Sequence, residues 1–461
     1  MNTTQTLSAL GLLLIATTLE VSGDAVVRLA IYNHSGLVRM ALMVGGAISV
    51  AMSTAAQTPQ PFEVRRAEAA FEELPVLNAS EILRPEMLAG PHHKVREEVP
   101  TYFGANKFTI DSDFGVFEAN GNEMLIRRIN EINAIAKLKE ISRSDEFKNA
   151  LTAAAKAPVA GIKNIASDPA NTISNAPKGV MKFMSRAGES LKGLGKKNQS
   201  SSAEGSTMQQ LIGYSDKKRK VAIELGVDPY STNTVLQHEL DQIAWASFAG
   251  GATFSILTMP IGGGAGAALT VTDVTTSFDE MLREKSPTDL KIINRKTLLG
   301  LGAREKDTER FLNNNAFSPS AQTAFVLNLK SLNGVANRGA FVRTAAETSS
   351  DESDAIFCVQ TAALMSKIHK EKPLARLEMI GDFPICVGKD GTTIVAFQWD
   401  YAAWTSGAAG FISDVQKLAT QPGKNHNVFV ALSGQVSPRL PQELEARGIT
   451  VQDRLAPGPL K

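Results

Sequence analysis

Charged side chains are missing from one long internal stretch of the sequence. Residues 242–272, QIAWASFAGGATFSILTMPIGGGAGAALTVT, contain no Asp, Glu, Lys, Arg or His. A stretch of this length with a Trp and two Phe would leave a large apolar patch if water reached it, so it must be buried in protein or in lipid. The absence of charge excludes an exposed loop, and we expect the fold to be organised around this stretch.

The charge-free stretch also lacks the continuity of a single membrane-spanning helix. A span needs about 20 mainly apolar residues, but Pro260 and six glycines interrupt this one. Pro260 predicts a break after Met259, with two shorter helices meeting at residues 260–264. Glycines permit close helix packing in water and in membranes alike. A hairpin buried in a soluble core, a hairpin inserted in a membrane and a strand-like segment therefore all remain open.

Cysteine is rare, and so is an excess of charge of one sign. The 461 residues include two cysteines, Cys358 and Cys386, which excludes a disulfide-rich scaffold. The two thiols could pair in an oxidising compartment, but two small buried hydrophobic side chains are the favoured interpretation. The formal net charge of +1 excludes a nucleic-acid footprint over the whole protein, which needs a basic surplus. No nucleic-acid partner is expected.

Sequence patterns that define a reaction are absent. There is no GxSxG, no CxxC and no HExxH, so the common hydrolase, thiol-redox and zinc-protease patterns are excluded. His92 and His93 are adjacent but have no Cys or carboxylate at ligand spacing, which makes them a poor metal site. His369, Asp400 and Tyr401 could be brought together by folding, but their spacing gives no support to a catalytic role. We therefore assign no catalytic residue, no metal site and no cofactor.

The N-terminal part of the chain has the layout of a secretory signal peptide. Residues 37–58 begin near Arg39, continue through a short apolar core and end in small residues, the order typical of such peptides. Cleavage near Ala55 or Ala56 would remove everything before it. Two uncleaved N-terminal membrane helices, or a true start at Met40, would also account for the two successive apolar runs. Export is the favoured interpretation.

Residues 161–200 carry a local excess of positive charge. Seven Lys or Arg stand against two acidic residues, a balance of +5, and apolar side chains lie between the cations. A basic helix with an apolar face can lie in a membrane interface, because apolar burial and attraction to anionic lipid add. A surface helix docked on the protein, with a solvated basic edge, fits the same pattern. The membrane-surface candidates are Lys178, Lys182, Arg186 and Lys192.

Apolar periodicity and turn residues predict the elements of the first half of the chain. Closely spaced prolines make residues 58–100 an extended linker. Residues 102–119 alternate aromatic and polar side chains, which indicates a β-hairpin, and an amphipathic helix is expected at 122–142. Thr234 and Gln237 form a plausible capping box for the helix that enters the charge-free stretch.

Cap and stop residues predict a helical region followed by a region that contains strands. Helices are expected at 287–299, 304–313, 319–332, 338–347, 354–370, 402–420 and 438–446, and strands at 374–380, 383–388, 392–398, 428–433 and 449–452. The last strand, helix and strand imply a right-handed crossover and a parallel pair.

The predicted fold class is α+β and mainly helical. We expect a central helical bundle with a buried Gly-rich helical hairpin and a small C-terminal α/β domain. The expected divisions are a leader at 1–57, a linker at 58–100, a β-hairpin with amphipathic and basic helices at 101–225, the bundle at 226–350 and the α/β domain at 351–461.

One turn in the C-terminal region has the layout of an anion site. Ser433, Gly434 and Ser437 lie where a predicted strand leads into a helix N-terminus, whose free backbone amides can hold an anion. The turn lacks the further glycines of a dinucleotide fingerprint and the lysine of a phosphate loop. A purely structural turn is the favoured alternative.

Several phrases of the sequence, VDPYSTNTVLQHELDQIAWASFAGG, SPTDLKIINRKTLLGLG and LSGQVSPRLPQELEARGITV, resemble a group of bacterial exported proteins of uncharacterised function. The similarity covers roughly residues 95–455. It implies export but assigns no activity, and none of these phrases is a functional motif.

Taken together, these features predict an exported bacterial envelope protein, periplasmic or membrane-associated, that acts by binding. Its expected partner is anionic lipid or another envelope protein. An enzyme with a site in the C-terminal α/β domain is the first alternative, and a structural or assembly subunit is the second.

Overall fold

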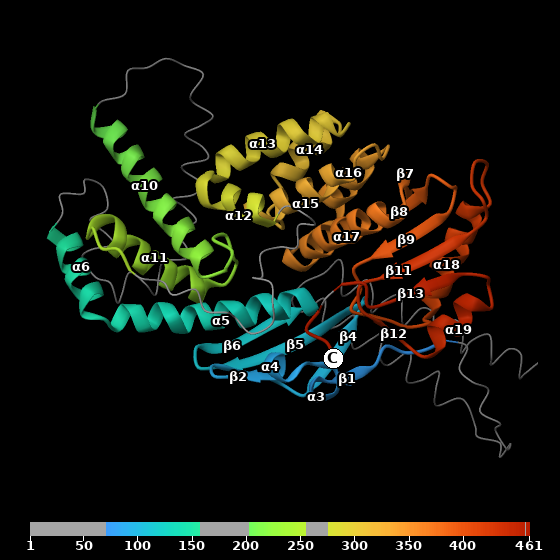
Figure 1. The fold of residues 1–461 in the computed structure, drawn as a ribbon, viewed down its shortest axis with the longest axis horizontal. Coiled ribbons are helices and arrows are strands. Elements are labelled where there is room, and N and C mark those ends of the chain that lie inside the picture. The colour runs from blue at the N-terminus through green and yellow to red at the C-terminus, as the bar shows by residue number, and fades with distance from the viewer. Residues whose placement is uncertain (1–70, 157–201, 255–274, 457) are drawn as a thin grey trace, which may run out of the picture. The chain divides into compact units, whose positions relative to one another are not determined.

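Three β-sheets and a larger set of helices account for the described chain (Figure 1). The computed structural model describes residues 71–156, 202–254, 275–456 and 458–461. The class is α+β and mainly helical, as the sequence predicts. The predicted leader lies outside the described residues, and so do the membrane-surface candidates Lys178, Lys182, Arg186 and Lys192.

The first sheet is antiparallel. Its six strands are β1 (Val76–Asn78), β2 (Ala89–Gly90), β3 (His93–Val95), β4 (Glu98–Tyr102), β5 (Ala105–Ser112) and β6 (Gly115–Asn120), in the order β1-β4-β5-β3-β2 with β6 paired to β5. The helices α3 (Ala79–Ile82) and α4 (Pro85–Leu88) lie between its first strands. Residues 76–102 therefore form regular elements, not the predicted extended linker. The prolines are compatible with this because Pro85, for example, occupies the first turn of α4, where its missing N–H is not needed.

The predicted hairpin and the long amphipathic helix are confirmed. Strands β5 and β6 pair from Lys107 opposite Asn120 to Ser112 opposite Gly115. Helix α5 (Asn122–Arg143) follows directly. It buries the apolar stripe that the periodicity indicates: Leu125, Ile129, Ile132, Ile135 and Leu138.

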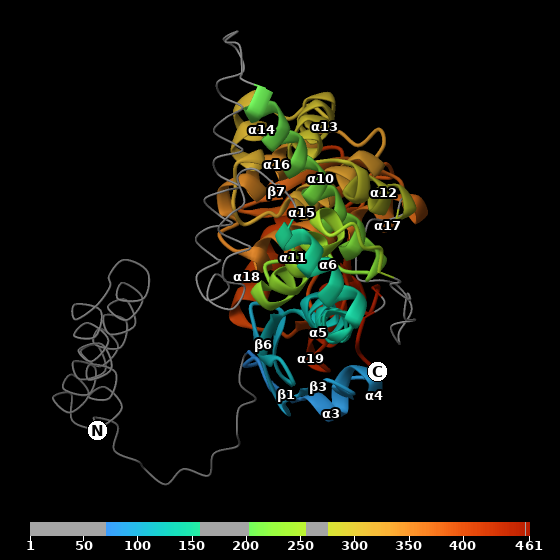
Figure 2. The same cartoon turned by 90° about the vertical axis from the view of Figure 1, so that its left-hand side faces the viewer.

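Three helices pack together with α5. They are α6 (Asp145–Lys156), α10 (Ser202–Glu224) and α11 (Thr234–Ala249), and α11 contacts each of the other three (Figure 2). The cap of α11 is Asn233, whose side chain accepts from the amides of Val235 and Leu236. The capping box predicted at Thr234 and Gln237 is wrong by one position, because Asn is as good an N-cap as Thr.

The described part of the charge-free stretch, residues 242–254, is buried near its start and half-buried or exposed at its end, where Gly251 and Thr253 are exposed despite the expectation of burial. Its buried residues are Ile243, Ala244, Trp245 and Ala246. Helix α11 then ends at Ala249, before the break predicted after Met259. The two following glycines explain this end. A Cβ on Gly250 would lie 2.2 Å from the Ala150 carbonyl oxygen, and Gly251 has a left-handed φ of 70°, which glycine adopts without strain. The rest of the stretch lies outside the described residues.

Six helices follow, and the last five lie in the order that the cap residues predict, whereas the first is not predicted from the sequence. They are α12 (Thr275–Glu284), α13 (Pro287–Gly300), α14 (Glu305–Leu312), α15 (Pro319–Ser331), α16 (Arg338–Thr348) and α17 (Glu352–Glu371). The predicted Ser-Pro starts are confirmed at α13 and α15. Ser286 and Ser318 accept from the amides of Asp289 and Ala321, with proline in the first turn of each helix.

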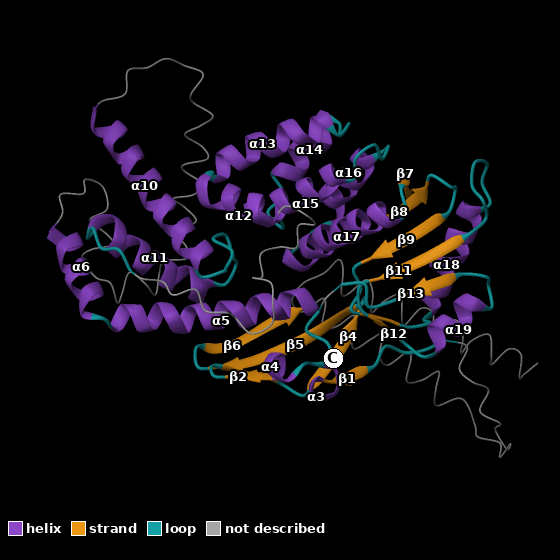
Figure 3. Ribbon diagram, in the orientation of Figure 1, coloured by secondary structure: helices purple, strands orange, loops and turns teal. Residues whose placement is uncertain are grey.

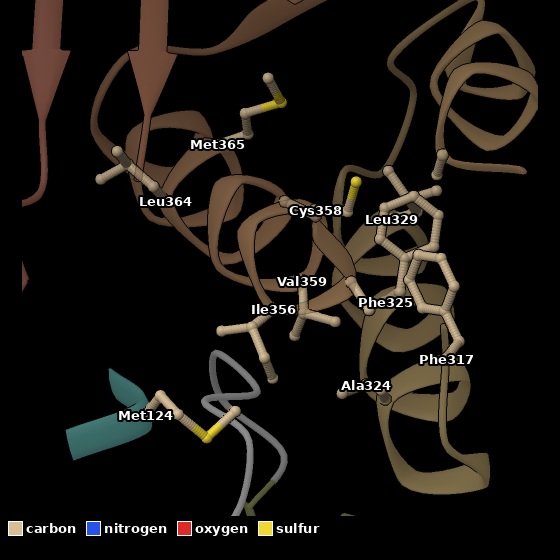
Figure 4. Packing of buried hydrophobic residues seen from close by; sticks show 14 of the residues in the cluster. Met124, Phe317, Ala324, Phe325, Leu329, Ile356, Cys358, Val359, Leu364 and Met365 are labelled. Atoms are coloured by element: carbon tan, nitrogen blue, oxygen red, sulfur yellow. The ribbon is translucent and has the colours of Figure 1, made fainter. Parts of the chain in front are cut away.

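Aromatic rings fill the core around α15. The ring of Phe325 lies 5.2 Å from that of Phe311 on α14 and 5.1 Å from that of Phe341 on α16, between centroids. Leu329 of α15 lies near Cys358 of α17 in Figure 4. These side chains are fully or almost fully buried, so apolar burial holds the helices together.

The C-terminal sheet is mixed, as Figure 3 shows in orange. Its strands are β7 (Leu374–Ile380), β8 (Phe383–Gly388), β9 (Thr393–Phe397), β11 (Val428–Leu432) and β13 (Thr450–Gln452), in the order β13-β11-β9-β8-β7. Strand β8 pairs antiparallel with both β7 and β9. Strand β11 is parallel to β9 and to β13, and its pairing with β13 confirms the predicted parallel pair.

Two helices, α18 (Ser406–Ala419) and α19 (Arg439–Glu445), belong to this C-terminal region. Helix α18 starts later than predicted. The residues before it, Tyr401–Ala402, form β10, which pairs in parallel with β12 (Gln435–Val436) as a separate two-stranded sheet.

Both cysteines are buried and unpaired. Cys358 lies on α17 and Cys386 on β8, which agrees with the favoured interpretation of two buried thiols. Within the described ranges, none of the helices combines the length and the apolar character that crossing a membrane requires.

Candidate functional site

The turn predicted as an anion site is closed by a neighbouring segment. The amide of Ser433 donates to Phe397 O at 3.2 Å, that of Gly434 to Trp399 O at 2.8 Å, and that of Ser437 to Ala402 O at 2.8 Å. The backbone approach is so close that a Cβ on Gly434 would lie 2.2 Å from the carbonyl oxygen of Asp400. These amides hold two chain segments together, which is the role of a structural turn.

The chain places a carboxylate of its own at this turn. Glu72 Oε2 accepts from Ser437 Oγ and from the amide of Trp404, each at 2.6 Å. The amide of Glu72 in turn donates to Trp404 O at 2.9 Å. Ser437 Oγ also accepts from the amide of Leu440 in α19. Sequence reasoning could not find this contact, because Glu72 and Ser437 are 365 positions apart.

Asp400 is a buried carboxylate held by backbone amides. Its Oδ2 accepts from the amides of Asn106 at 2.9 Å and Asn122 at 3.0 Å, and its Oδ1 accepts from Gln398 Nε2 at 3.2 Å. Its own amide donates to Gly104 O at 2.7 Å. Burial raises the pKa of Asp400 to about 6, against the opposing effect of these donors. Asp400 thus fastens β5 and the start of α5 to the segment that follows β9.

The three residues considered for catalysis have different partners. His369 accepts from the amide of Leu374 through Nδ1, at 3.0 Å, so its Nε2 donates to Asn333 O at 3.2 Å. Tyr401 lies in β10, where burial, together with the charge of Glu72, raises the pKa of its hydroxyl. Neither has a hydrogen bond to Asp400 among the described residues, so the structure does not assemble them into a catalytic group.

The adjacent histidines lie in different surroundings. His92 is exposed, and its Nδ1 lies 2.8 Å from Asp113 Oδ2. His93 is buried, and burial lowers the pKa of its ring. Across the described residues, no group of three His, Cys, Asp or Glu side chains is arranged to hold a metal ion.

Buried charges also gather where α5 meets the loop before α11. Glu131 Oε2 accepts from Arg128 Nη1 at 2.7 Å and from Asn233 Nδ2 at 2.9 Å. Arg128 Nη2 also reaches Glu352 on α17, at 3.1 Å. Each of these three charged side chains has a hydrogen-bonded partner of opposite sign, which is the arrangement that buried ion pairs need. The network ties α17 to α5, and its groups are committed to one another.

An open cleft of about 560 Å³ lies between the helical region and the C-terminal sheet. Arg304 and Asp307 line it at the start of α14, and Arg343 lines it on α16. Glu378 on β7 and Leu418 on α18 complete its other side. Its volume lies within the range of about 300–1,000 Å³ usual for small-molecule sites. This cleft is the candidate functional site.

The acidic side chains of the cleft are paired. Asp307 accepts from Nε and Nη2 of Arg304, at 2.6 and 3.1 Å. Glu378 accepts from Arg376 at 2.7 Å and from Lys424 at 2.9 Å. Burial opposes the ionised form of Glu378, but these two donors outweigh it and lower the pKa of the carboxyl group.

Arg343 is different, because it has no hydrogen bond or ion pair within the described chain. It is half-buried on α16. Glu347 lies four positions further along the same helix, a spacing that allows an ion pair, but Glu347 binds Arg310 of α14 instead. The pairing of Glu347 with Arg310, which leaves Arg343 without a partner in the described chain, depends on how α14 packs against α16. Sequence reasoning could not find this packing, and therefore missed the cleft.

Comparisons with known proteins supply no relative from which a role could be taken. No protein-family model, no curated protein and no solved structure matches this chain.

Proposed function

We propose that this chain is an exported bacterial envelope protein, periplasmic or membrane-associated, that acts by binding rather than by catalysis. The observation that carries the proposal is the basic segment at residues 161–200, with its balance of +5 and its interleaved apolar side chains. Such a segment suits the surface of an anionic membrane, where apolar burial and charge attraction add. The signal-like run before it and the resemblance to exported proteins support the location.

The experiment is flotation of the full chain with liposomes, in anionic and in neutral vesicles. We expect the protein to float with anionic vesicles only. Reversing three charges in one variant, Lys178→Glu, Lys182→Glu and Lys192→Glu, should abolish flotation. A control with the same change of charge, Lys330→Glu, Lys370→Glu and Lys389→Glu, alters cations outside the segment. If the wild type stays at the bottom of the gradient, or if the segment variant floats as well as the control, the membrane partner is excluded.

The N-terminus of the purified mature protein tests the location. Cleavage near Ala55 or Ala56 would agree with export, whereas a native cytosolic chain that keeps its leader would contradict it. We also propose the finer parts of the predicted fold, which are a central helical bundle with a buried Gly-rich helical hairpin and a small C-terminal α/β domain. Another envelope protein as partner, or an assembly role, remains a proposal of the same kind.

The enzyme alternative has less support. The amides of the turn at Ser433, Gly434 and Ser437 donate to carbonyl oxygens of the neighbouring segment 397–402. The charged network on α5 is likewise committed to internal partners. A binding role needs neither of these groups.

A further inference from the structure

We propose that the cleft beside α16 binds a small molecule with a phosphate or carboxylate group, and that Arg343 contacts this oxyanion. The inference concerns a soluble ligand and a part of the chain remote in sequence from the basic segment, so it does not rest on the membrane proposal. It rests on three features of the cleft: its charge, its shape and the rigidity of its wall.

Charge is the first feature. The cleft and its immediate partners contain four cations, Arg304, Arg343, Arg376 and Lys424, against two anions, Asp307 and Glu378. The surplus is positive. Arg304 is engaged with Asp307, and Arg376 and Lys424 with Glu378. Of these four cations, only Arg343 has no hydrogen bond or ion pair to a residue that the structure describes. A guanidinium presents five N–H donors in a planar fork that matches phosphate and carboxylate oxygens.

Shape is the second feature. Gly339, Ala340 and Arg343 all line the cleft from α16. Positions separated by three or four residues share one face of a helix, and long side chains on a helix point toward its N-terminus. An Arg343 side chain that follows this rule lies over Gly339 and Ala340. The room for a ligand is the open volume of the cleft, about 560 Å³, and not the surface of Gly339, which packs on the loop before α14.

Rigidity of the wall is the third feature. Asn337 stands before α16 in the left-handed conformation, with φ 63°, and its Nδ2 donates to Leu377 O at 2.8 Å. Ala336 exchanges two backbone hydrogen bonds with β7, from its amide to Ala375 O and from the amide of Leu377 to its carbonyl. Gly339 packs so closely on the loop before α14 that a Cβ would lie 2.9 Å from Ala303 Cα. The start of α16 is thus fixed to its neighbours, and little ordering is needed on binding.

The test is calorimetric titration of the full chain with pyrophosphate and, separately, with succinate. Sodium chloride at matched ionic strength serves as the blank. The two probes distinguish a phosphate site from a carboxylate site. We expect one of them to bind the wild type, and Arg343→Gln to weaken binding by about tenfold or more, since the lost contact is a hydrogen bond between charged groups. The control Lys330→Gln removes one exposed cation from α15, outside the cleft, and should leave the affinity within about twofold.

A second variant tests the charge argument without touching the cleft lining. Arg310→Gln releases Glu347, which can then pair with Arg343 on the same helix. We expect weaker binding than in the wild type, with an unchanged circular dichroism spectrum. If neither probe binds, or if Arg343→Gln binds as tightly as Lys330→Gln, the site is excluded. If Arg310→Gln binds as tightly as the wild type, the unpaired charge of Arg343 is not what selects the ligand.

Discussion

The first sheet and the C-terminal sheet bury their strands in opposite ways. In β4 of the first sheet, buried and exposed positions alternate: Val99 and Thr101 are buried, while Glu98, Pro100 and Tyr102 are exposed. In β9 and β11 of the C-terminal sheet every position is buried. The first pattern belongs to an antiparallel sheet with one face toward water, and the second to parallel strands covered on both faces.

This difference shows where the stability of each sheet must come from. A strand buried on both faces is held by apolar packing over its whole length, so removing one side chain leaves a cavity. A sheet with one face exposed to solvent is packed on its other face alone. In this protein, polar groups join that first sheet to the rest of the chain. The carboxylate of Asp400 accepts hydrogen bonds from backbone amides of β5 and α5. The backbone amide of Asp400 donates a hydrogen bond to the carbonyl oxygen of Gly104.

The largest expected effect comes from truncating the doubly buried strand. Phe397 on β9 is fully buried, with its ring 5.3 Å from that of Phe383 and 5.5 Å from that of Phe411. Phe397→Ala should lower the free energy of unfolding by about 3–5 kcal/mol, measured by urea denaturation. Val116→Ala in β6, where the side chain is 59% exposed, should change it by no more than about 0.5 kcal/mol. Equal losses in the two variants would erase the contrast between the sheets.

The second effect is a dependence of stability on pH at the tie between the sheets. The pKa of Asp400 is about 6 in the folded chain, raised from 3.8, so the folded state binds this proton more tightly. The stabilisation that comes from this tighter proton binding is complete below pH 4 and is lost as the pH rises through 6. The loss is about 3 kcal/mol, at about 1.4 kcal/mol per pKa unit.

Asp400→Asn tests this dependence, because the amide cannot ionise. Between pH 4 and pH 7 the variant should lose less unfolding free energy than the wild type, by about the same 3 kcal/mol. Comparing the two proteins removes the contribution of buried acids elsewhere in the chain, such as Asp228. The exposed Asp382→Asn serves as the matched control and should follow the wild type. Parallel pH curves for Asp400→Asn and wild type would contradict the role of this carboxylate.

The smallest effect concerns the segment that leads into the first sheet. Glu72→Ala leaves Ser437 Oγ and the amide of Trp404 without their acceptor. We expect a loss of about 1–3 kcal/mol and faster proteolysis near residue 72. Glu73→Ala, at an exposed neighbouring position, should leave both measurements unchanged. An unaffected Glu72→Ala chain would mean that the first sheet does not need this contact.

The sequence is most informative where a local rule decides the structure. The Ser-Pro pairs before α13 and α15 predict their starts, because the hydroxyl cap and the proline act within one turn. The runs TIVAF and VFVAL predict β9 and β11, since short and almost entirely apolar runs bounded by turn residues suit covered strands. The alternation in residues 102–119 likewise predicts the β5–β6 hairpin.

Prediction fails where distant segments decide. The strands β1 to β4 are short and lie in a proline-containing part of the chain. Two of them, β3 and β4, pair with β5, and local propensity does not reveal this pairing. The end of α11 is set by the close approach of Gly250 to Ala150, a contact between separate helices. In the cleft, Arg343 has no partner in the described chain because Glu347, four positions further along α16, pairs with Arg310 of α14 instead.

The two cysteines have a practical consequence. Cys358 on α17 and Cys386 on β8 are enclosed in the same hydrophobic core, and burial raises the pKa of both thiols to about 12. Because the thiolate is the reactive form, a labelling reagent can modify either sulfur only when the surrounding structure opens. The rate of labelling at each position therefore reports how often that part of the native chain opens, without any engineered probe.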